Sequence, residues 1–495
     1  MAKRGRKGAH QMKRIVNALG KLNWGKRAYA VFVLCATTAI ALPAQTFTTL
    51  HSFNGTDGAS PEAAPVQATN GSLYGTTPGG GANGGGTVFR ITPSGTLTTL
   101  YSFCAQSGCP DGELSIAGLV QATNGDFYGT TAGGGVNGSG GTVFKITPGG
   151  TLTTLYSFCA QSGCPHGASP YAELVQATNG DFYGTTSFGG ANNVGTIFEI
   201  TPGGTLATLH SFDATDGAEP FAGLVQATNG DFYGTTYAGG ANNSGTVFKI
   251  TPGGTLTTLY TFCSQGSNCA DGSDPSGLVQ ATNGNLYGTT FIGGSQINPA
   301  QGTAFKFTPS GTLTTLHDFS YVTGGANPAA GLVQATDGNF YGTTENDGAH
   351  HGGTIFMITP KGKLTTLYNF CSQTGCTDGQ TPLATLVQDT DGSFYGTAAA
   401  GGANGNGTVF SLSVGLGPFV ETQTTSGKVG TAIKILGTDL TGATSVAFNG
   451  TAAMFTVVSR YLITTTVPAG ASTGRVQVVT PIGTLSSNAR FRVVP

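Results

Sequence analysis

The sequence LVQATNGDFYGTT occupies residues 119–131 and recurs without change at residues 174–186 and 224–236. Looser copies bring the aromatic-Gly-Thr part of this motif to seven, and successive copies are 50 to 55 residues apart. The copies are marked by Tyr74, Tyr128, Tyr183, Tyr233, Tyr287, Tyr341 and Tyr395. Repetition at a fixed period of this length is typical of architectures built from equivalent stacked units. The sequence therefore predicts seven copies of one supersecondary unit.

Each unit contains four short runs rich in Thr, Val, Phe and Tyr, the residue types favoured in β-strands. In the second copy these runs are AGLVQAT (117–123), DFYGTT (126–131), GTVFKIT (141–147) and TLTTLYSF (151–158). The dipeptide NG separates the first two runs and PGG separates the last two, and both are turn signals. Each unit is therefore expected to be a four-stranded antiparallel sheet.

The two ends of the repeat region indicate how the units are arranged. The last repeat stops after its third run, GTVFSLSV (407–414), whereas TFTTLHSF (46–53) is a fourth-run copy that precedes the first repeat. If the N-terminal strand completes the last sheet, the two ends of the ring are joined and the open edges there are removed. This favours an all-β, seven-bladed β-propeller over residues 46–414. An extended β-solenoid is the alternative, but it does not account for the displaced strand.

The period ends after Gly415, and a different pattern follows. Residues 417–495 contain short alternating strands separated by Gly-containing turns. This pattern is typical of a small immunoglobulin-like β-sandwich. We therefore expect a second domain there.

Both regions resemble known families. The repeat GLVQATNGDFYGTTYAGGANNSGTVFKITPGGTLTTLYTF (223–262) resembles the GloVer tandem repeat of bacterial choice-of-anchor proteins, and the resemblance covers residues 46–414. It implies an exported bacterial protein that is secreted or lies at the cell surface, and it supplies no catalytic residues. The C-terminal segments SGKVGTAIKILGTDL, SVAFNG and FRVV are similar to the IPT/TIG immunoglobulin-like family, which implies a supporting or binding module.

The N-terminus has the pattern of a secretory signal. The first 27 residues hold nine Lys or Arg and no acidic residue, and the apolar run AYAVFVLCATTAIAL (28–42) follows. We predict a signal peptide over residues 1–44, with an uncleaved anchor as the alternative. No membrane span is expected in the mature chain, which we place outside the cytoplasm. Its net charge of about −11 makes nucleic acid an improbable partner.

Eight of the nine cysteines form four local pairs near the ends of fourth runs. The pairs are Cys104 with Cys109, Cys159 with Cys164, Cys263 with Cys269, and Cys371 with Cys376. Local pairs in an exported chain favour four disulfides. Zinc is the alternative, but it requires two pairs to converge and an unusual ligand spacing.

Asp-Gly pairs recur in the segments that join successive units, at Asp57, Asp111, Asp216, Asp271 and Asp378. One pair per unit is more typical of a turn than of a metal site. The segments DATDG (213–217) and DGSDP (271–275) leave calcium as an alternative. We expect no other metal and no cofactor.

Candidate ligand contacts are sought where the repeats differ. After the second strand, aromatic or acidic residues appear only in units three to six, as Phe188, Tyr237, Phe291 and Glu345. Aromatic rings beside a carboxylate suit sugar recognition, so a glycan is the preferred ligand and an extracellular protein the other partner class. Packing of Tyr237 and Phe291 against adjacent units is the structural alternative. The sequence does not indicate an oligomeric state.

A polysaccharide-acting enzyme is the alternative function. Unit six contains ENDGAHH (345–351), in which Glu345, Asp347, His350 and His351 are weak candidates for acid–base chemistry or metal binding. Adjacent loop histidines are more often solvated, so no catalytic residue is assigned.

Overall fold

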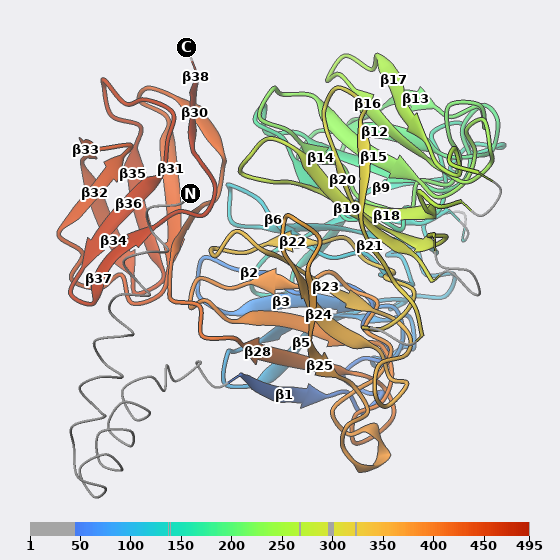
Figure 1. Ribbon diagram of the computed structural model, residues 1–495, viewed down its shortest axis with the longest axis horizontal. Helices are drawn as coiled ribbons and strands as arrows, with labels where there is room; N and C mark the ends of the chain where they lie inside the picture. The colour runs from blue at the N-terminus through green and yellow to red at the C-terminus, as the bar shows by residue number, and fades with distance from the viewer. Residues whose placement is uncertain are drawn as a thin grey trace, which may run out of the picture. The chain divides into compact units, whose positions relative to one another are not determined.

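The computed structural model describes residues 45–136, 138, 140–266, 269–295, 301–321 and 324–494. These residues form seven four-stranded antiparallel sheets and a C-terminal sandwich (Figure 1). The sheets are the blades of a propeller, and we number the strands of each blade one to four from the axis outward. The prediction of a seven-bladed, all-β propeller is confirmed. The predicted signal peptide, residues 1–44, lies outside the described residues.

The propeller strands follow one pattern in every blade. The first strands are β2 (Val66–Gln67), β6 (Val120–Gln121), β10 (Val175–Gln176), β14 (Val225–Gln226), β18 (Ser273–Gln280), β22 (Val333–Gln334) and β26 (Val387–Gln388). The second strands are β3 (Leu73–Thr77), β7 (Phe127–Thr131), β11 (Phe182–Thr186), β15 (Phe232–Thr236), β19 (Leu286–Ile292), β23 (Phe340–Thr344) and β27 (Phe394–Ala398). The third strands are β4 (Thr87–Ile91), β8 (Thr142–Ile146), β12 (Thr196–Ile200), β16 (Thr246–Ile250), β20 (Thr303–Phe307), β24 (Thr354–Ile358) and β28 (Thr408–Ser413). The fourth strands are β5 (Leu97–Ser102), β9 (Leu152–Ser157), β13 (Leu206–Ser211), β17 (Leu256–Thr261), β21 (Leu313–Asp318), β25 (Leu364–Asn369) and β1 (Thr46–Ser52).

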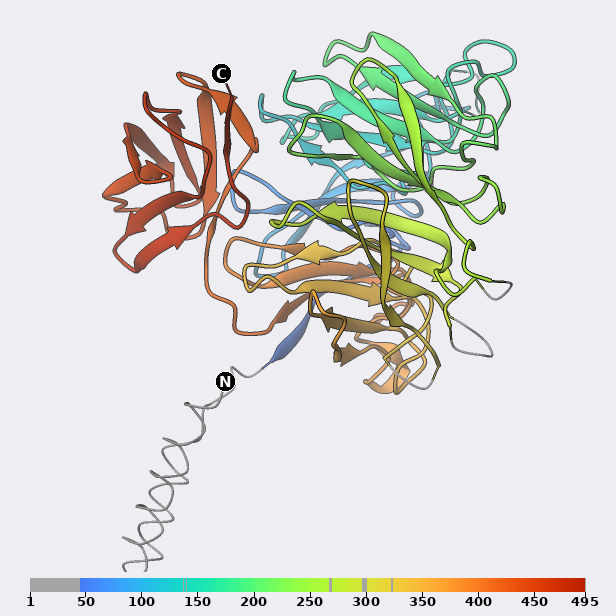
Figure 2. The ribbon, with the colours of Figure 1, turned by 45° about the horizontal axis from the view of Figure 1, so that its top comes forward.

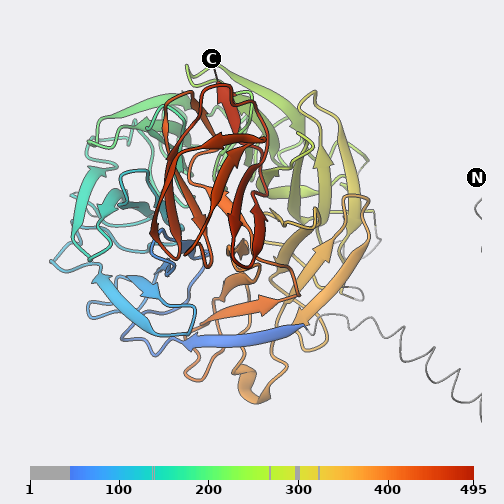
Figure 3. The ribbon, with the colours of Figure 1, turned by 90° about the vertical axis from the view of Figure 1, so that its left-hand side faces the viewer.

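The N-terminal strand closes the ring. β1 pairs antiparallel with β28, with Thr46 opposite Ser413 and Ser52 opposite Thr408. Figure 3 shows β1, in blue, beside the orange strands of the last blade. The predicted closure is therefore confirmed, and the seventh blade combines strands from both ends of the repeat region.

The first strands are shorter than the sequence predicts. The run 117–123 contributes only the two residues of β6, and the other first strands except β18 are equally short. Part of the reason is that backbone carbonyls just before the first strand accept hydrogen bonds from a threonine of the preceding blade. Thr130 Oγ1, for example, donates to the carbonyl oxygens of Pro170 and Ala172 at 3.2 and 3.3 Å. Pro170 also has no N–H to donate to a ladder.

The second-strand motif is constant because each of its residues has a packing role. A Cβ on Gly129 would lie 2.7 Å from Cζ of Phe144, so the position excludes any side chain. Thr131 Oγ1 lies 2.8 Å from Thr142 Oγ1 on the third strand. The Tyr128 ring stacks on Phe182 of the next blade, with centroids 4.1 Å apart. The motif therefore joins each blade to itself and to its neighbour.

A ring of hydrogen bonds connects all seven blades. In every blade, the backbone N–H of the Thr in the first hairpin donates to Oε1 of the first-strand Gln in the next blade. The seven bonds measure 2.8 to 3.1 Å and join Thr69 to Gln121, Thr123 to Gln176, Thr178 to Gln226, Thr228 to Gln280, Thr282 to Gln334, Thr336 to Gln388 and Thr390 to Gln67. The last bond closes the ring.

The closing seam between blades seven and one differs from the others. Gln67 Nε2 donates to Asp389 Oδ1 at 2.6 Å, whereas the other six first-strand glutamines donate to a Gly carbonyl in their own hairpin. Asp389 stands where the repeat has Ala122, and its side chain is buried. Burial, and then the negative charge of Asp391, raises the pKa of Asp389 to about 7. The seam therefore contains a carboxyl group that titrates near neutral pH.

The C-terminal sandwich has its own core. Its strands are β29 (Val420–Thr422), β30 (Ser426–Lys428), β31 (Ala432–Gly437), β32 (Ser445–Phe448), β33 (Thr451–Ala453), β34 (Phe455–Ser459), β35 (Leu462–Thr466), β36 (Val476–Thr480), β37 (Gly483–Ser486) and β38 (Arg492–Val494). The two main sheets have the orders β29-β31-β35-β34 and β33-β32-β36-β37, and β30 pairs parallel with β38. Figure 2 shows this domain in orange and red. Ile435, Ile463 and Val478 are fully buried between them. The proposed boundary between 414 and 417 falls in the segment between β28 and β29.

The sandwich makes hydrogen bonds to the first hairpins of the propeller. Lys434 Nζ donates to Thr123 O at 2.8 Å, and Asn488 Nδ2 donates to Gln334 O at 2.8 Å. Further bonds join Gln423 to Gln121 and Ala122, Arg492 to Thr228, and Thr438 to Thr390. In an antiparallel blade these hairpins lie at the end opposite the links between blades. The link face therefore carries none of these bonds.

Replacing a ring glutamine should weaken the propeller. In Gln121→Met, the N–H of Thr69 loses its acceptor, which should cost about 1 kcal/mol of unfolding free energy. Gln67→Met should cost more, about 2 kcal/mol, because it leaves both Asp389 and the N–H of Thr390 buried without this partner. Urea unfolding measures both changes. Gln106→Met at an exposed link position is the control, and an equal loss there would contradict the ring's role.

Asp389→Asn should remove a pH dependence of stability. Because burial raises the folded-state pKa to about 7, the native chain binds this proton more tightly than the unfolded chain does. The stabilising contribution is complete below about pH 4 and is lost as the pH rises through about 7. Between pH 5 and 8 the wild type should lose about 2–3 kcal/mol relative to the variant in urea unfolding. Parallel pH profiles for the two proteins would contradict this assignment.

Candidate functional site

The links between blades and the loops between second and third strands meet on one face of the propeller. Ala168 of a link bridges to Phe188 of such a loop, and Ala218 and Ala326 bridge in the same way to Ala238 and Asn346. We call this surface the link face. Each of these bridges joins a link to the second–third loop of the blade that follows it, so both kinds of segment share this face.

Three aromatic rings form a chain on the link face. Tyr171 and Phe221 follow the prolines of two consecutive links, and their ring centroids are 5.4 Å apart. Phe221 in turn contacts Tyr237 of the second–third loop, at 5.3 Å and nearly perpendicular. Phe221 is 36% exposed, and the tyrosines are half-buried. We call Tyr171, Phe221 and Tyr237 the aromatic chain.

Two acidic side chains lie beside Tyr237, the last ring of the aromatic chain. Burial raises the pKa of the Tyr237 phenol, and the negative charges of Asp274 and Glu219 raise it further. Asp274 lies at the start of β18, the first strand of the next blade, and is held by Ser273 Oγ, which donates to its Oδ1 at 2.7 Å. The tyrosine hydroxyl therefore stays protonated in neutral solution and keeps a hydrogen to donate, beside carboxylates that accept hydrogen bonds.

The structure distributes the predicted ligand-binding residues over four blades. Tyr237 belongs to the aromatic chain. Its ring packs against Phe221 and is only half-buried, so part of its surface is also open to a ligand. Phe188 is 37% exposed, and Phe291 is half-buried. Burial raises the pKa of Glu345. Within the described ranges, no ring contact links Tyr237 to Phe188 or Phe291, so a site that includes all four residues stays a prediction.

Blade six holds the acidic and histidine candidates. Asp347 Oδ1 lies 2.8 Å from His351 Nδ1, and the imidazole is 84% exposed while the carboxylate is buried. Asp347 Oδ2 is buried and finds no hydrogen-bond partner in the described part of the chain. Asp347 adopts φ 69° at a position where the other six blades have Gly. His350 is exposed in the same loop.

The aromatic chain includes two residues that the sequence analysis missed. The link position after proline holds Glu62, Tyr171, Phe221, Ala329 and Leu383 in blades one, three, four, six and seven. It varies as much as the position after the second strand. A comparison of the repeats at the link positions, as well as in the loops between second and third strands, would have identified Tyr171 and Phe221 as residues that differ between blades.

The link carboxylates act within turns. Asp216 Oδ1 accepts the N–H of Asp213 at 3.0 Å, and its Oδ2 lies 2.7 Å from His210 Nε2. Asp271 and Asp378 likewise accept backbone N–H groups of their links. The prediction of an Asp-containing turn is confirmed at these positions, and calcium stays the alternative.

The four predicted disulfides are present and confirmed. They join Cys104 to Cys109, Cys159 to Cys164, Cys263 to Cys269 and Cys371 to Cys376, with Cα atoms 4.0 to 4.2 Å apart. The loop closed by the Cys371–Cys376 bond contains the 3₁₀ turn η1 (Thr374–Cys376). Among the described residues, the one group of three close potential metal ligands is Cys104, Cys109 and Glu113, and both of its sulfurs belong to a disulfide. Closing so short a loop contributes about 2 kcal/mol to stability through chain entropy.

The fold and the link face define a repeat propeller joined to an immunoglobulin-like module, a combination that suggests a binding or surface protein. The Gloeobacter/Verrucomicrobia repeat matches residues 36–165, 109–270 and 264–454, and the IPT/TIG domain matches residues 418–493. The chain therefore belongs to the Gloeobacter/Verrucomicrobia repeat family and carries a C-terminal IPT/TIG domain. Both resemblances seen in the sequence are confirmed.

The similarity to solved structures concerns the fold alone. A fungal alcohol oxidase of the AA5 family, in complex with copper, is 14% identical with a TM-score of 0.51, and the match covers 91% of this chain and 99% of that one. A GH74 enzyme from Niastella koreensis is 18% identical with a TM-score of 0.47, covering 88% and 65% of the two chains. A gluconolactonase from Xanthomonas campestris is 12% identical with a TM-score of 0.38, covering 76% and 92%. No curated protein matches the sequence significantly.

Proposed function

We propose that this protein binds glycans outside the cytoplasm through the aromatic chain on the link face. The observation that carries the proposal is the contact of Tyr171, Phe221 and Tyr237, which brings three rings from two consecutive blades together. Aromatic rings provide large, rigid surfaces that stack on the apolar faces of sugar rings. The carboxylates of Glu219 and Asp274 supply acceptors for sugar hydroxyl groups beside Tyr237.

Two further observations support this proposal. The repeated residues are occupied by contacts within and between blades, so the residues that vary on the link face are those available to a ligand. Four disulfides fit an oxidising compartment, which agrees with the signal peptide predicted from the sequence.

The described residues include no helix with the length and apolar character needed to cross a bilayer.

Removing two rings of the aromatic chain should weaken glycan binding. The double variant Phe221→Ala, Tyr237→Ala loses two stacking surfaces, each contributing about 0.5–1.5 kcal/mol, so affinity should fall about tenfold or more. A glycan array identifies the ligand, and calorimetry measures the affinity. Tyr321→Ala removes an exposed aromatic side chain from a different link and should leave the affinity unchanged. Equal binding by the wild type and a folded double variant would reject this site.

Polysaccharide cleavage is the second candidate function, and the Asp347–His351 pair favours it. A buried carboxylate that orients an exposed imidazole is an arrangement suited to general acid–base chemistry. Under this alternative the wild type should release reducing ends from a polysaccharide, and Asp347→Asn or Glu345→Gln should lower the rate at least 100-fold. Lys361→Gln, at a distant turn, is the control. Absence of product from the wild type on every glycan that it binds would exclude this alternative.

A further inference from the structure

Beyond residue 44, Lys and Arg are denser in the IPT/TIG domain than in the propeller. Residues 417–495 hold six Lys or Arg and two Asp or Glu, a net charge of +4. Residues 46–414 hold six basic and 21 acidic residues, a net charge of −15. The net positive charge of this domain gives it a different preference for charged partners from that of the acidic propeller.

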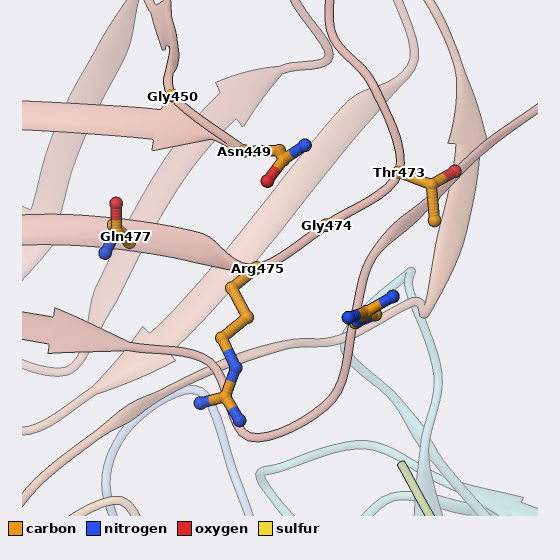
Figure 4. A pocket seen from close by; sticks show the side chains of 7 residues that line it. Asn449, Gly450, Thr473, Gly474, Arg475 and Gln477 are labelled. Carbon is orange, nitrogen blue, oxygen red and sulfur yellow. The ribbon is translucent and has the colours of Figure 1, made fainter. Parts of the chain in front are cut away.

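A pocket of about 440 Å³ lies on this domain and contains two of its arginines (Figure 4). The pocket is lined by Asn449, Thr473, Arg475, Gln477 and Arg490, together with Gly450 and Gly474. The lining thus offers guanidinium, amide and hydroxyl groups and no carboxylate. Its chemistry suits an anion with neighbouring hydroxyl groups.

The backbone brings the two segments that carry these arginines side by side. Gly474 and Phe491 form an antiparallel bridge, with N···O distances of 3.1 and 2.8 Å in the two directions. The bridge is isolated, and Arg475 and Arg490 are the chain neighbours of the two bridged residues. Two cationic side chains that line one pocket repel each other, so an anion bound between them is favoured.

The pocket is held in shape by contacts beneath it. Arg475 Nη1 donates to the carbonyl of the buried Ser487 at 3.1 Å, which leaves its other N–H groups available. Asn449 Nδ2 donates to Ser472 Oγ at 2.8 Å. A Cβ on Gly474 would lie 2.2 Å from Cγ of Asn449, so this wall requires glycine. Arg490 has no hydrogen-bond or ion-pair partner within residues 324–494, so its donors are available.

We propose that this pocket binds the carboxylate of a uronic-acid residue in an acidic oligosaccharide. Two guanidinium groups hold the carboxylate through charge-assisted hydrogen bonds, and Asn449 and Gln477 contact the sugar hydroxyls. The choice of a sugar acid over a free anion rests on the proposed glycan binding. The pocket gives the protein a second subsite that recognises charge, whereas the aromatic chain recognises sugar faces.

The test measures binding of tetragalacturonate by calorimetry. Arg490→Gln and Arg475→Gln should each weaken binding at least tenfold, and the wild-type affinity should fall as salt is raised. Arg490→Lys keeps the charge but not the bidentate fork, so a severalfold loss is expected. Arg460→Gln is the matched control, because this arginine of the same domain pairs with Asp439, and it should bind within twofold of the wild type.

Three outcomes would overturn the proposal: wild-type affinity in both pocket variants, equal affinity for the methyl-esterified tetramer, or equal affinity for inorganic sulfate. The Phe221→Ala, Tyr237→Ala variant separates the two proposals. Retained tetragalacturonate binding by this variant supports an independent pocket. Retained binding of a neutral glycan by Arg490→Gln shows that the variant is folded and that its loss is specific to the acidic ligand.

Discussion

The hydrogen bond from a hairpin threonine N–H to the next blade's glutamine is the constraint on which the ring depends. Its donor and acceptor belong to the same short motif, VQAT, so each copy serves two neighbours at once. A change in one copy therefore breaks a contact with a different copy. This reciprocity, together with the stacking of Tyr on the next blade's aromatic residue, explains why blades with the same packing problem keep the same residues.

The ring departs from this pattern where the two ends of the repeat region meet. Ala398 replaces the threonine that pairs with the third strand in the other blades, and Thr408 Oγ1 is consequently buried without a partner among the described residues. Gln67 turns to Asp389, and Thr390 next to it contacts Thr438 of the sandwich at 3.0 Å. The seam thus brings ring closure, domain contact and a titrating carboxyl group together in neighbouring residues.

Sequence reasoning predicted what periodicity determines. Blade number, strand order and closure follow from the spacing of Tyr74 to Tyr395 and from the displaced run 46–53, because the same local pattern must pack in the same way. Contacts across blades are different. Tyr171 and Phe221 are 50 residues apart, and only the closed ring shows that their rings touch. The presence of Arg475 and Arg490 in one pocket likewise depends on the pairing of Gly474 with Phe491, which no repeat specifies.

The two proposed subsites divide recognition according to charge. The propeller, with a net charge of −15, repels polyanions from its surface as a whole, so an acidic glycan gains little there beyond ring stacking. The sandwich, with a net charge of +4, attracts the same glycan but has no comparable chain of aromatic rings among its described residues. A polymer with both neutral and acidic sugars is the ligand that suits both domains. Two weak subsites on one chain then act together through effective concentration, provided that the polymer reaches both.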